Sequence, residues 1–194
     1  RLGLPHREET VLMSVPTIAV FVGSLRKDSC NRKLAHALEK IAGDRARFQY
    51  VQIGDLPLYD QDDDAAFPAA GLRFKQQVEA CDALLFVTPE YNRSIPGVLK
   101  NAIDHASRPY GQNAWAGKPA GVLGVSVGAI GTALAQQHLR NILAYLDAPT
   151  LGAPEAFIQA KEGLFDADGQ VGQASRAFLQ GWMDRYVAWV KKHA

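Results

Sequence analysis

A nine-residue segment with the composition of an anion-binding loop lies near the start of the chain. It runs from Gly23 to Asn31, follows the apolar run Thr17 to Val22 and precedes a stretch with helical periodicity. A loop between a strand and a helix offers an anion converging N–H donors and the positive end of the helix dipole. The side chains suited to holding an anion are Ser24, Arg26, Ser29 and Asn31. We therefore expect a bound phosphate group at this loop.

The glycine and lysine positions of this loop narrow the kind of phosphate ligand. A Walker A loop requires a lysine followed directly by serine or threonine, whereas Lys27 is followed by Asp28. The dinucleotide fingerprint requires three glycines, and this loop has only Gly23. A terminal monophosphate therefore fits better than ATP or a pyrophosphate. The alternative is that the serine and asparagine side chains are ordinary turn and helix-cap residues.

Two other segments that follow apolar runs carry residues suited to a planar ring. The segment Thr88 to Gly97 combines a stiff backbone, an aromatic face and hydrogen-bonding groups, and the segment Gly124 to Gly131 is rich in glycine, which lets backbone N–H groups approach a ligand closely. The residues of interest are Pro89, Glu90, Tyr91, Asn92, Ser126 and Gly128. Together with the phosphate loop, these segments predict a mononucleotide site, with phosphate at one end and ring at the other.

Short apolar runs alternate with helix-period segments, which is typical of a parallel sheet covered on both faces. The predicted strands are Thr17 to Val22, Arg47 to Val51, Ala83 to Val87, Ala120 to Val127, and a fifth near Ala148 to Leu151 that continues around Phe157. Ligands of such sheets bind beyond the carboxyl ends of the strands, where the strand order reverses. We expect an α/β fold with a doubly wound five-stranded sheet, whose loops after strands one, three and four face one pocket.

Apolar residues at helical spacing predict the inner faces of four helices. These residues are Leu34, Ala35, Leu38, Ile41 and Ala42; Leu99, Ile103 and Ala106; Leu139, Ile142 and Leu146; and Phe178, Trp182, Met183, Tyr186 and Val190. We interpret them as core residues that hold the helices against the sheet.

Composition and charge exclude several classes of partner. Of the 194 residues, 47% are hydrophobic and 21% are charged, as in ordinary globular proteins. The formal net charge is +1 and the charged residues are dispersed, so we expect neither a nucleic-acid partner nor a membrane partner. No apolar run approaches membrane-spanning length. The five histidines lack the spacing of metal ligands, and no metal site is expected.

The first sixteen residues and the two cysteines suggest how the chain is divided into segments and in which compartment it folds. Residues 1–16 lack the apolar segment of a signal peptide and are expected to form a flexible arm, and residues 17–194 are expected to form a single domain. Cys30 and Cys81 lie far apart and form no disulfide framework, which suits a reducing cytoplasm.

One motif points to a different class of enzyme. Gly124 to Gly128 satisfies Gly-x-Ser-x-Gly, the pattern around a hydrolase nucleophile, with Ser126 in the nucleophile position. A triad in that order would need an acid and then a histidine later in the chain, which leaves only His193, the penultimate residue. Terminal residues fray, so a glycine turn explains the pattern better than a serine hydrolase does.

The loop motifs resemble the NADPH-dependent FMN reductase family, and within it the branch of bacterial quinone and chromate reductases. The residues that carry the resemblance are Gly23-Ser24-Leu25-Arg26 with Ser29 and Asn31, Pro89-Glu90-Tyr91-Asn92 with Ser94, Pro96, Gly97, Lys100 and Asn101, then Ser107 to Tyr110 and Trp115 to Pro119. The resemblance spans roughly residues 17 to 160. His105 stands where tryptophan is expected in relatives, and the last thirty residues match no motif.

The resemblance implies a flavodoxin-like fold with strand order 2-1-3-4-5, bound FMN, NADPH or NADH as co-substrate, and a homodimer or homotetramer. The residues implied to hold the FMN phosphate are Ser24, Arg26, Ser29, Cys30 and Asn31. The residues implied to line the flavin ring are Pro89, Glu90, Tyr91 and Asn92, with Ser126 and Gly128 at its far end.

These observations predict an FMN-dependent NAD(P)H oxidoreductase that passes two electrons to a small acceptor, such as a quinone, chromate, an azo compound or free flavin. The hydride chemistry belongs to the flavin, so no catalytic side chain is expected. The alternative on the same fold is a non-catalytic electron carrier or flavin sensor. The dispersed charge argues against a carrier, because docking to redox partners relies on complementary fields.

Overall fold

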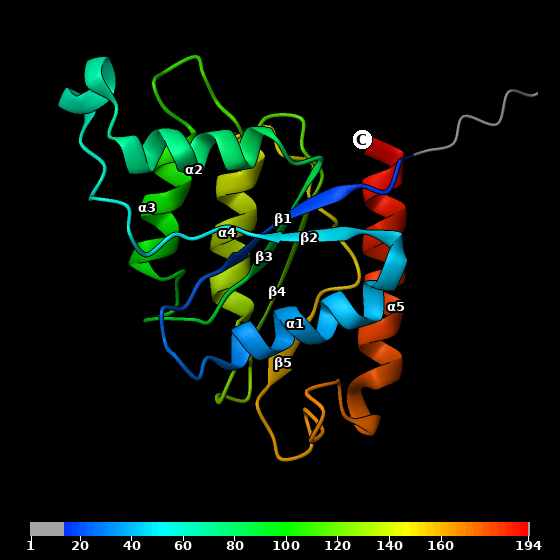
Figure 1. The fold of residues 1–194 in the computed structure, drawn as a ribbon. Coiled ribbons are helices and arrows are strands. Elements are labelled where there is room, and N and C mark those ends of the chain that lie inside the picture. The colour runs from blue at the N-terminus through cyan, green and yellow to red at the C-terminus, as the bar shows by residue number, and fades with distance from the viewer. Residues whose placement is uncertain (1–13, 194) are drawn as a thin grey trace, which may run out of the picture.

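The structure is a computed structural model that describes residues 14–193. Five parallel strands form one sheet in the order β2-β1-β3-β4-β5 (Figure 1). Their bounds are β1 (Thr17–Val22), β2 (Arg47–Tyr50), β3 (Ala83–Val87), β4 (Ala120–Ser126) and β5 (Phe157–Gln159). The strand order reverses between β1 and β3, as in a doubly wound sheet. The predicted flavodoxin-like fold and its strand order are confirmed.

Helices cover both faces of the sheet (Figure 1). On one face lie α1 (Cys30–Ala42) and α5 (Gln173–His193), and on the other lie α2 (Ala69–Glu79), α3 (Gly97–Ala106) and α4 (Ala133–Tyr145). Two short 3₁₀ helices, η1 (Gly43–Arg45) and η2 (Gln61–Ala66), lie in connections. The apolar stripes did not predict α2, because Gly71 and Lys75 occupy part of its buried face.

The centre of the sheet is rigidly packed. All five residues of β3 are buried, since helices cover both of its sides. On the side of α2, α3 and α4, Phe21 stacks on Phe86 with ring centroids 4.9 Å apart, and Trp115 meets Phe21 edge-on at 5.2 Å. The Trp115 indole N–H donates to Ile103 O at 2.9 Å, so this buried polar group is satisfied. This packing therefore fixes the positions of the strand ends from which the loops begin.

Two details of the prediction are wrong. The run Ala148 to Leu151 is not a strand, because only Thr150 forms an isolated bridge, to Ala120. Proline at 149 and 154 removes N–H donors that a strand would need, and regular pairing with β4 begins only at Phe157. On α5, Phe178 is 47% exposed, and the buried stripe begins one residue later at Leu179.

His105, which stands where tryptophan is expected in relatives, is accommodated in a buried aromatic pocket. Its ring lies edge-on to Tyr59 at 5.7 Å and to Phe67 at 5.6 Å. Its Nε2 lies 2.9 Å from Pro57 O and can donate to it. Asn101, one turn earlier on α3, donates to the same carbonyl at 2.8 Å. The histidine thus helps hold the segment before α2 against α3.

The predicted N-terminal arm falls mostly on residues 1–13, which lie outside the described residues; residues 14–16 lead into β1 without regular structure. Within residues 14–193, no helix combines the length and the apolar character needed to cross a membrane.

Candidate functional site

Three loops meet at the carboxyl edge of the sheet: the first loop (Gly23–Asn31), the second loop (Thr88–Gly97) and the third loop (Gly124–Gly131). Backbone pairing continues from the strands into these loops, since Gly23 N–H donates to Val87 O at 2.9 Å and Thr88 N–H donates to Leu123 O at 3.0 Å. The starting points of the loops are therefore held at the spacing of neighbouring strands.

Thr88 packs against Gly23 on one side and Gly124 on the other, so closely that neither glycine could carry a side chain. A Cβ at Gly23 would lie 2.6 Å from Thr88 Oγ1, and one at Gly124 would lie 1.9 Å from Thr88 O. Thr88 itself is fully buried, and its hydroxyl donates to Pro89 O at 2.9 Å. The two glycines are thus required by close backbone approach, which brings the three loops together.

The first loop has the arrangement expected of a phosphate cradle. Ser29 caps α1, its Oγ accepting from Arg32 N–H at 3.3 Å, and Ser24 Oγ accepts from Arg26 N–H at 3.3 Å. Within the described residues, the N–H groups of Cys30 and Asn31, at the first two positions of the helix, have no side-chain cap. The first turn of α1 contains no acidic residue, so no carboxylate within the turn competes with an anion for the positive end of the helix dipole.

Asn31 has a role that the sequence did not predict. Its side chain is buried, its Nδ2 donates to Val125 O at 2.9 Å, and its Oδ1 accepts from Val125 N–H at 2.9 Å. Both ends of the amide are therefore used in joining α1 to β4. The Nδ2 group keeps a second hydrogen, and the backbone N–H of Asn31 has no side-chain cap, so a role for Asn31 in holding the phosphate stays a prediction.

The second loop is a tight hairpin that presents Tyr91. Tyr91 and Ser94 exchange backbone hydrogen bonds of 2.9 and 3.0 Å, and Asn92 and Arg93 between them adopt left-handed conformations, with φ of 51° and 66°. Two consecutive residues of positive φ are typical of a two-residue hairpin turn. Tyr91, directly before the turn, is 48% exposed, so its side chain is accessible to a ligand.

Glu90 holds this hairpin against α4. Its Oε2 accepts from the N–H groups of Leu134 and Ala135 at 3.0 and 3.1 Å, and Arg93 lies 3.5 Å from its other oxygen. A carboxylate at a helix N-terminus satisfies free donors and interacts favourably with the helix dipole. The side chain predicted to line the ring is therefore a distant helix cap, which fixes the second loop relative to α4.

A cavity of about 460 Å³ joins the first two loops. The residues that line it from the first loop are Gly23, Leu25 and Arg26, and those from the second loop and α3 are Tyr91, Pro96, Gly97 and Val98. Arg26 and Tyr91 thus meet across one space, with a cation on one side and an aromatic ring on the other. The predicted residues Ser126 and Gly128 lie on the neighbouring third loop, where Ser126 Oγ accepts from Gly128 N–H at 3.3 Å.

The structure contradicts the hydrolase alternative. Ser126 lies at the carboxyl end of β4, whereas His193 lies at the far end of α5, on the opposite side of the molecule (Figure 1). His193 Nδ1 is 2.9 Å from Trp189 O, within its own helix. Among residues 14–193, no cluster of His, Cys, Asp and Glu could hold a metal ion. The site therefore offers anion donors and an aromatic face, which suits binding of a phosphorylated ring system.

Comparison with known proteins identifies the family. The sequence profile of the NADPH-dependent FMN reductases matches residues 16–163. The chain belongs to the NADPH-dependent FMN reductase family. It is 56% identical over 175 residues to a 2-hydroxy-1,4-benzoquinone reductase of a Burkholderia species, an alignment that covers 90% of this chain and 96% of that protein. It is 50% identical over 181 residues to a quinone reductase of Pseudomonas putida, covering 93% and 97%.

A solved structure agrees with these relatives. The flavoenzyme NAD(P)H:(acceptor) oxidoreductase of Paracoccus denitrificans superimposes with a TM-score of 0.89 at 52% identity, covering 92% of this chain and 99% of that one. The predictions of an FMN cofactor, of NAD(P)H as reductant and of an oxidoreductase activity are confirmed. The residues present fit FMN, because Arg26 and the accessible ring of Tyr91 border one cavity, and uncapped N–H groups at the start of α1 belong to the same loop as Arg26.

Replacing Asn31 with alanine tests its assigned role in the fold. The change leaves the N–H and C=O of Val125 without partners in a buried position, and we expect the free energy of unfolding to fall by about 2 kcal/mol. Urea denaturation with FMN present in excess measures the loss. Gln76→Ala, on the exposed side of α2, is the control and should change stability by less than about 0.5 kcal/mol. Equal stability of Asn31→Ala and the parent protein would contradict the assignment.

Proposed function

We propose that this chain is an FMN-containing quinone reductase that takes two electrons from NAD(P)H and passes them to a quinone-like acceptor. The observation that carries the proposal is the cavity in which the first loop, beside the N-terminus of α1, faces Tyr91 of the second loop. The acceptor class is supported by the two relatives at 56% and 50% identity, which are named as reductases of a hydroxybenzoquinone and of quinones.

In this proposal the FMN phosphate is bound by the first loop. The hydroxyls of Ser24 and Ser29 and the N–H groups of Cys30 and Asn31 donate to its oxygens, and Arg26 adds a positive charge at the open side. Hydrogen bonds to a charged acceptor are stronger than neutral ones, so several converging donors give firm retention. Ser24 and Ser29 are 4% and 3% exposed, which places these donors below the surface, where water competes less.

The flavin ring is held by the second and third loops. Tyr91 and Pro89 offer a flat apolar contact, and the backbone around Asn92 offers hydrogen-bonding groups at a fixed turn. Ser126 and Gly128 lie at the ring's far end, where the glycine lets a backbone N–H come close. The Glu90 side chain supports the flavin ring indirectly, because it fixes the hairpin that carries Tyr91 against α4.

When bound, FMN supplies the two-electron chemistry. The protein's part is to hold the ring with one face open to NAD(P)H and then to the acceptor, and to place N–H donors where negative charge accumulates on reduction. Tyr91, which is 48% exposed, stands at the entrance for both ligands. No side chain of the site needs to change its protonation state in this account.

We also propose that the chain forms a homodimer, or a homotetramer built from such dimers. A surface cavity of about 750 Å³ lies between α3 and α4 next to the second loop, lined by Ile95, Ile142 and His138 among others. Leu134 and Ile130 are 37% and 46% exposed at the start of α4. A second copy seated here would bury these apolar side chains and border the flavin site.

The two unpaired cysteines favour the cytoplasm as the location of the protein.

Anaerobic mixing tests the proposed activity. The purified protein should be yellow, NADPH should bleach its flavin absorbance, and a benzoquinone should restore the absorbance with one equivalent of quinone consumed per flavin. Stopped-flow absorbance measures both half-reactions. A yellow protein that NADPH and NADH both fail to bleach would contradict the proposal, as would a bleached protein that no quinone reoxidises.

Ser29→Asp separates phosphate binding from helix capping. Aspartate also caps helices, so the fold should be retained, but its negative charge should repel the FMN phosphate. We expect the Kd for FMN to rise by at least about 100-fold, measured by flavin fluorescence titration of the apoprotein. Ser175→Asp, in the first turn of α5, adds the same charge away from the site and should leave the Kd unchanged. Unchanged FMN affinity in Ser29→Asp would place the phosphate elsewhere.

A further inference from the structure

A second cavity lies beside the first loop, between α1 and the edge strand β2. Its volume is about 530 Å³. Val20 and Val22 of β1 contribute apolar surface, and Ser24 and Leu25 of the first loop close one end. Leu25 also lines the cavity assigned above to the flavin site, so the two cavities adjoin across this side chain. Of the residues that line the second cavity, only Ser24 is assigned above to FMN; those contributed by α1 and by β2 with the segment after it have no part in the proposed FMN binding.

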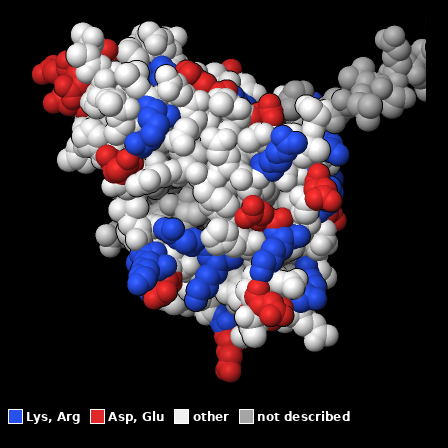
Figure 2. Space-filling model, in the orientation of Figure 1, with Lys and Arg blue, Asp and Glu red and all other residues white. Residues whose placement is uncertain are grey.

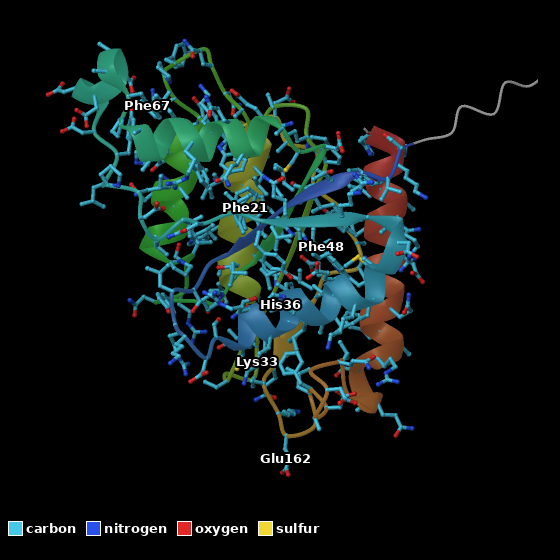
Figure 3. The ribbon with its side chains drawn as sticks, in the orientation of Figure 1. Phe21, Lys33, His36, Phe48, Phe67 and Glu162 are labelled. Carbon is cyan, nitrogen blue, oxygen red and sulfur yellow. The ribbon has the colours of Figure 1, made fainter. Side chains whose placement is uncertain are left out.

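One stripe of α1 faces this cavity. Arg32, His36 and Glu39 are spaced four and three residues apart, which places them on the same side of the helix. In Figure 3, His36 lies on the side of α1 that faces β2, and Lys33 lies on the other side. Arg32 and His36 line the cavity directly. The helix thus presents a cation and an aromatic ring to the same space.

The aromatic wall of the cavity is held in place. The rings of His36 and Tyr50 lie with centroids 4.7 Å apart, and Tyr50 Oη donates to Glu39 Oε2 at 2.9 Å. His36 Nδ1 lies 3.6 Å from the same oxygen. Burial, together with the Glu39 carboxylate, raises the pKa of the Tyr50 hydroxyl, so it remains a donor at neutral pH. A planar ring entering the cavity would find two aromatic side chains already oriented.

The two ends of the cavity differ in charge. Figure 2 shows Lys and Arg side chains gathered along the lower part of this face, over α1 and the loop before it, below a hollow in the surface. The basic residues of the loop and of the first turn of α1 are Arg26, Lys27, Arg32 and Lys33, and Lys40 near the end of α1 donates to Asp168 O. Glu39, the carboxylate on the same stripe, lies further along α1 beside Tyr50 and His36. An anionic group is therefore favoured at the Arg32 end and disfavoured at the Glu39 end.

We propose that this cavity binds the adenosine 2′-phosphate end of NADPH, with the phosphate at Arg32 and the adenine against His36 and Tyr50. The inference rests on the proposed function, because it assumes that NADPH reacts at the adjoining flavin site. A dinucleotide is longer than FMN, so an NADPH molecule that runs alongside FMN reaches beyond the FMN phosphate, and this cavity lies directly past the first loop.

The same residues give a reason for choosing between the two reductants. NADPH differs from NADH only in the 2′-phosphate, and an arginine guanidinium matches a phosphate in both charge and geometry. Arg32 is exposed on α1, and its side chain has no hydrogen bond or ion pair to another described residue. It is therefore available for a phosphate without breaking an existing contact. The cavity makes NADPH the preferred reductant.

Calorimetric titration of the oxidised, FMN-loaded protein tests the inference. The two probes are 2′,5′-ADP and 5′-ADP, which carry the same number of phosphate groups and differ in whether the ribose 2′ position is phosphorylated. We expect 2′,5′-ADP to bind at least about 10-fold more tightly than 5′-ADP. Arg32→Gln should abolish this preference, and His36→Ala should weaken both probes to a similar extent.

Lys33→Gln is the matched control, because it removes the same charge from the adjacent residue, which does not line the cavity. It should retain the preference for 2′,5′-ADP. Equal binding of the two probes by the parent protein, or an equal loss of preference in Arg32→Gln and Lys33→Gln, would overturn the inference. Retention of the yellow colour by each variant shows that the fold and the FMN site are intact.

The titration involves no electron transfer, so its result is independent of the activity. If the probes behave as expected but neither NADPH nor NADH bleaches the flavin, the proposed function fails and the nucleotide site stands. If NADPH and NADH bleach the flavin equally well and Arg32→Gln changes neither rate, the proposed function stands and this inference fails.

Discussion

The arrangement of the site depends on a buried amide that joins a helix to a strand. Asn31 accepts from and donates to the backbone of Val125, and thereby fixes the N-terminus of α1 against the carboxyl end of β4. A helix N-terminus attracts an anion only where its free N–H groups point, so this contact sets the direction of the proposed phosphate cradle relative to the third loop. Thr88, lodged between Gly23 and Gly124, sets the spacing of the same strand ends.

Polar residues near the site divide into two groups with different tasks. The buried side chains of Asn31 and Glu90 hold a helix end and a loop in place. The ligand is left with hydroxyls below the surface, free backbone N–H groups, and exposed side chains such as Arg26 and Tyr91. In the proposed function, such a site holds FMN through a preformed frame and leaves the reacting ring open to solvent on one side, as a reductase with small acceptors requires.

Much of the fold could be predicted because its signals are local. Continuous apolar runs marked β1 and β3 to the residue, and β4 nearly so, since a strand buried on both faces has no polar alternation. The fifth strand was misplaced because pairing at the edge of the sheet depends on which backbone groups its prolines leave available. Phe178 was misjudged because helical spacing alone does not say where the underlying sheet ends.

The site was predictable only in outline. The three loops could be found from their residue types, but Asn31 and Val125 are 94 residues apart and Glu90 and Leu134 are 44 apart, so only the folded chain shows that these side chains are already engaged. The cavity beside α1 was missed for the same reason. Its arginine, histidine and tyrosine carry no motif, and they meet because α1 crosses beside β2.

Comparing FMN with riboflavin tests the central claim most directly, because the two ligands share the ring and differ only in the phosphate. If the end of α1 and the first loop hold that phosphate, the apoprotein should bind FMN at least about 100-fold more tightly than riboflavin, as measured by fluorescence titration. Equal affinities would mean that the phosphate lies in solvent, and the account of the first loop as its cradle would be wrong.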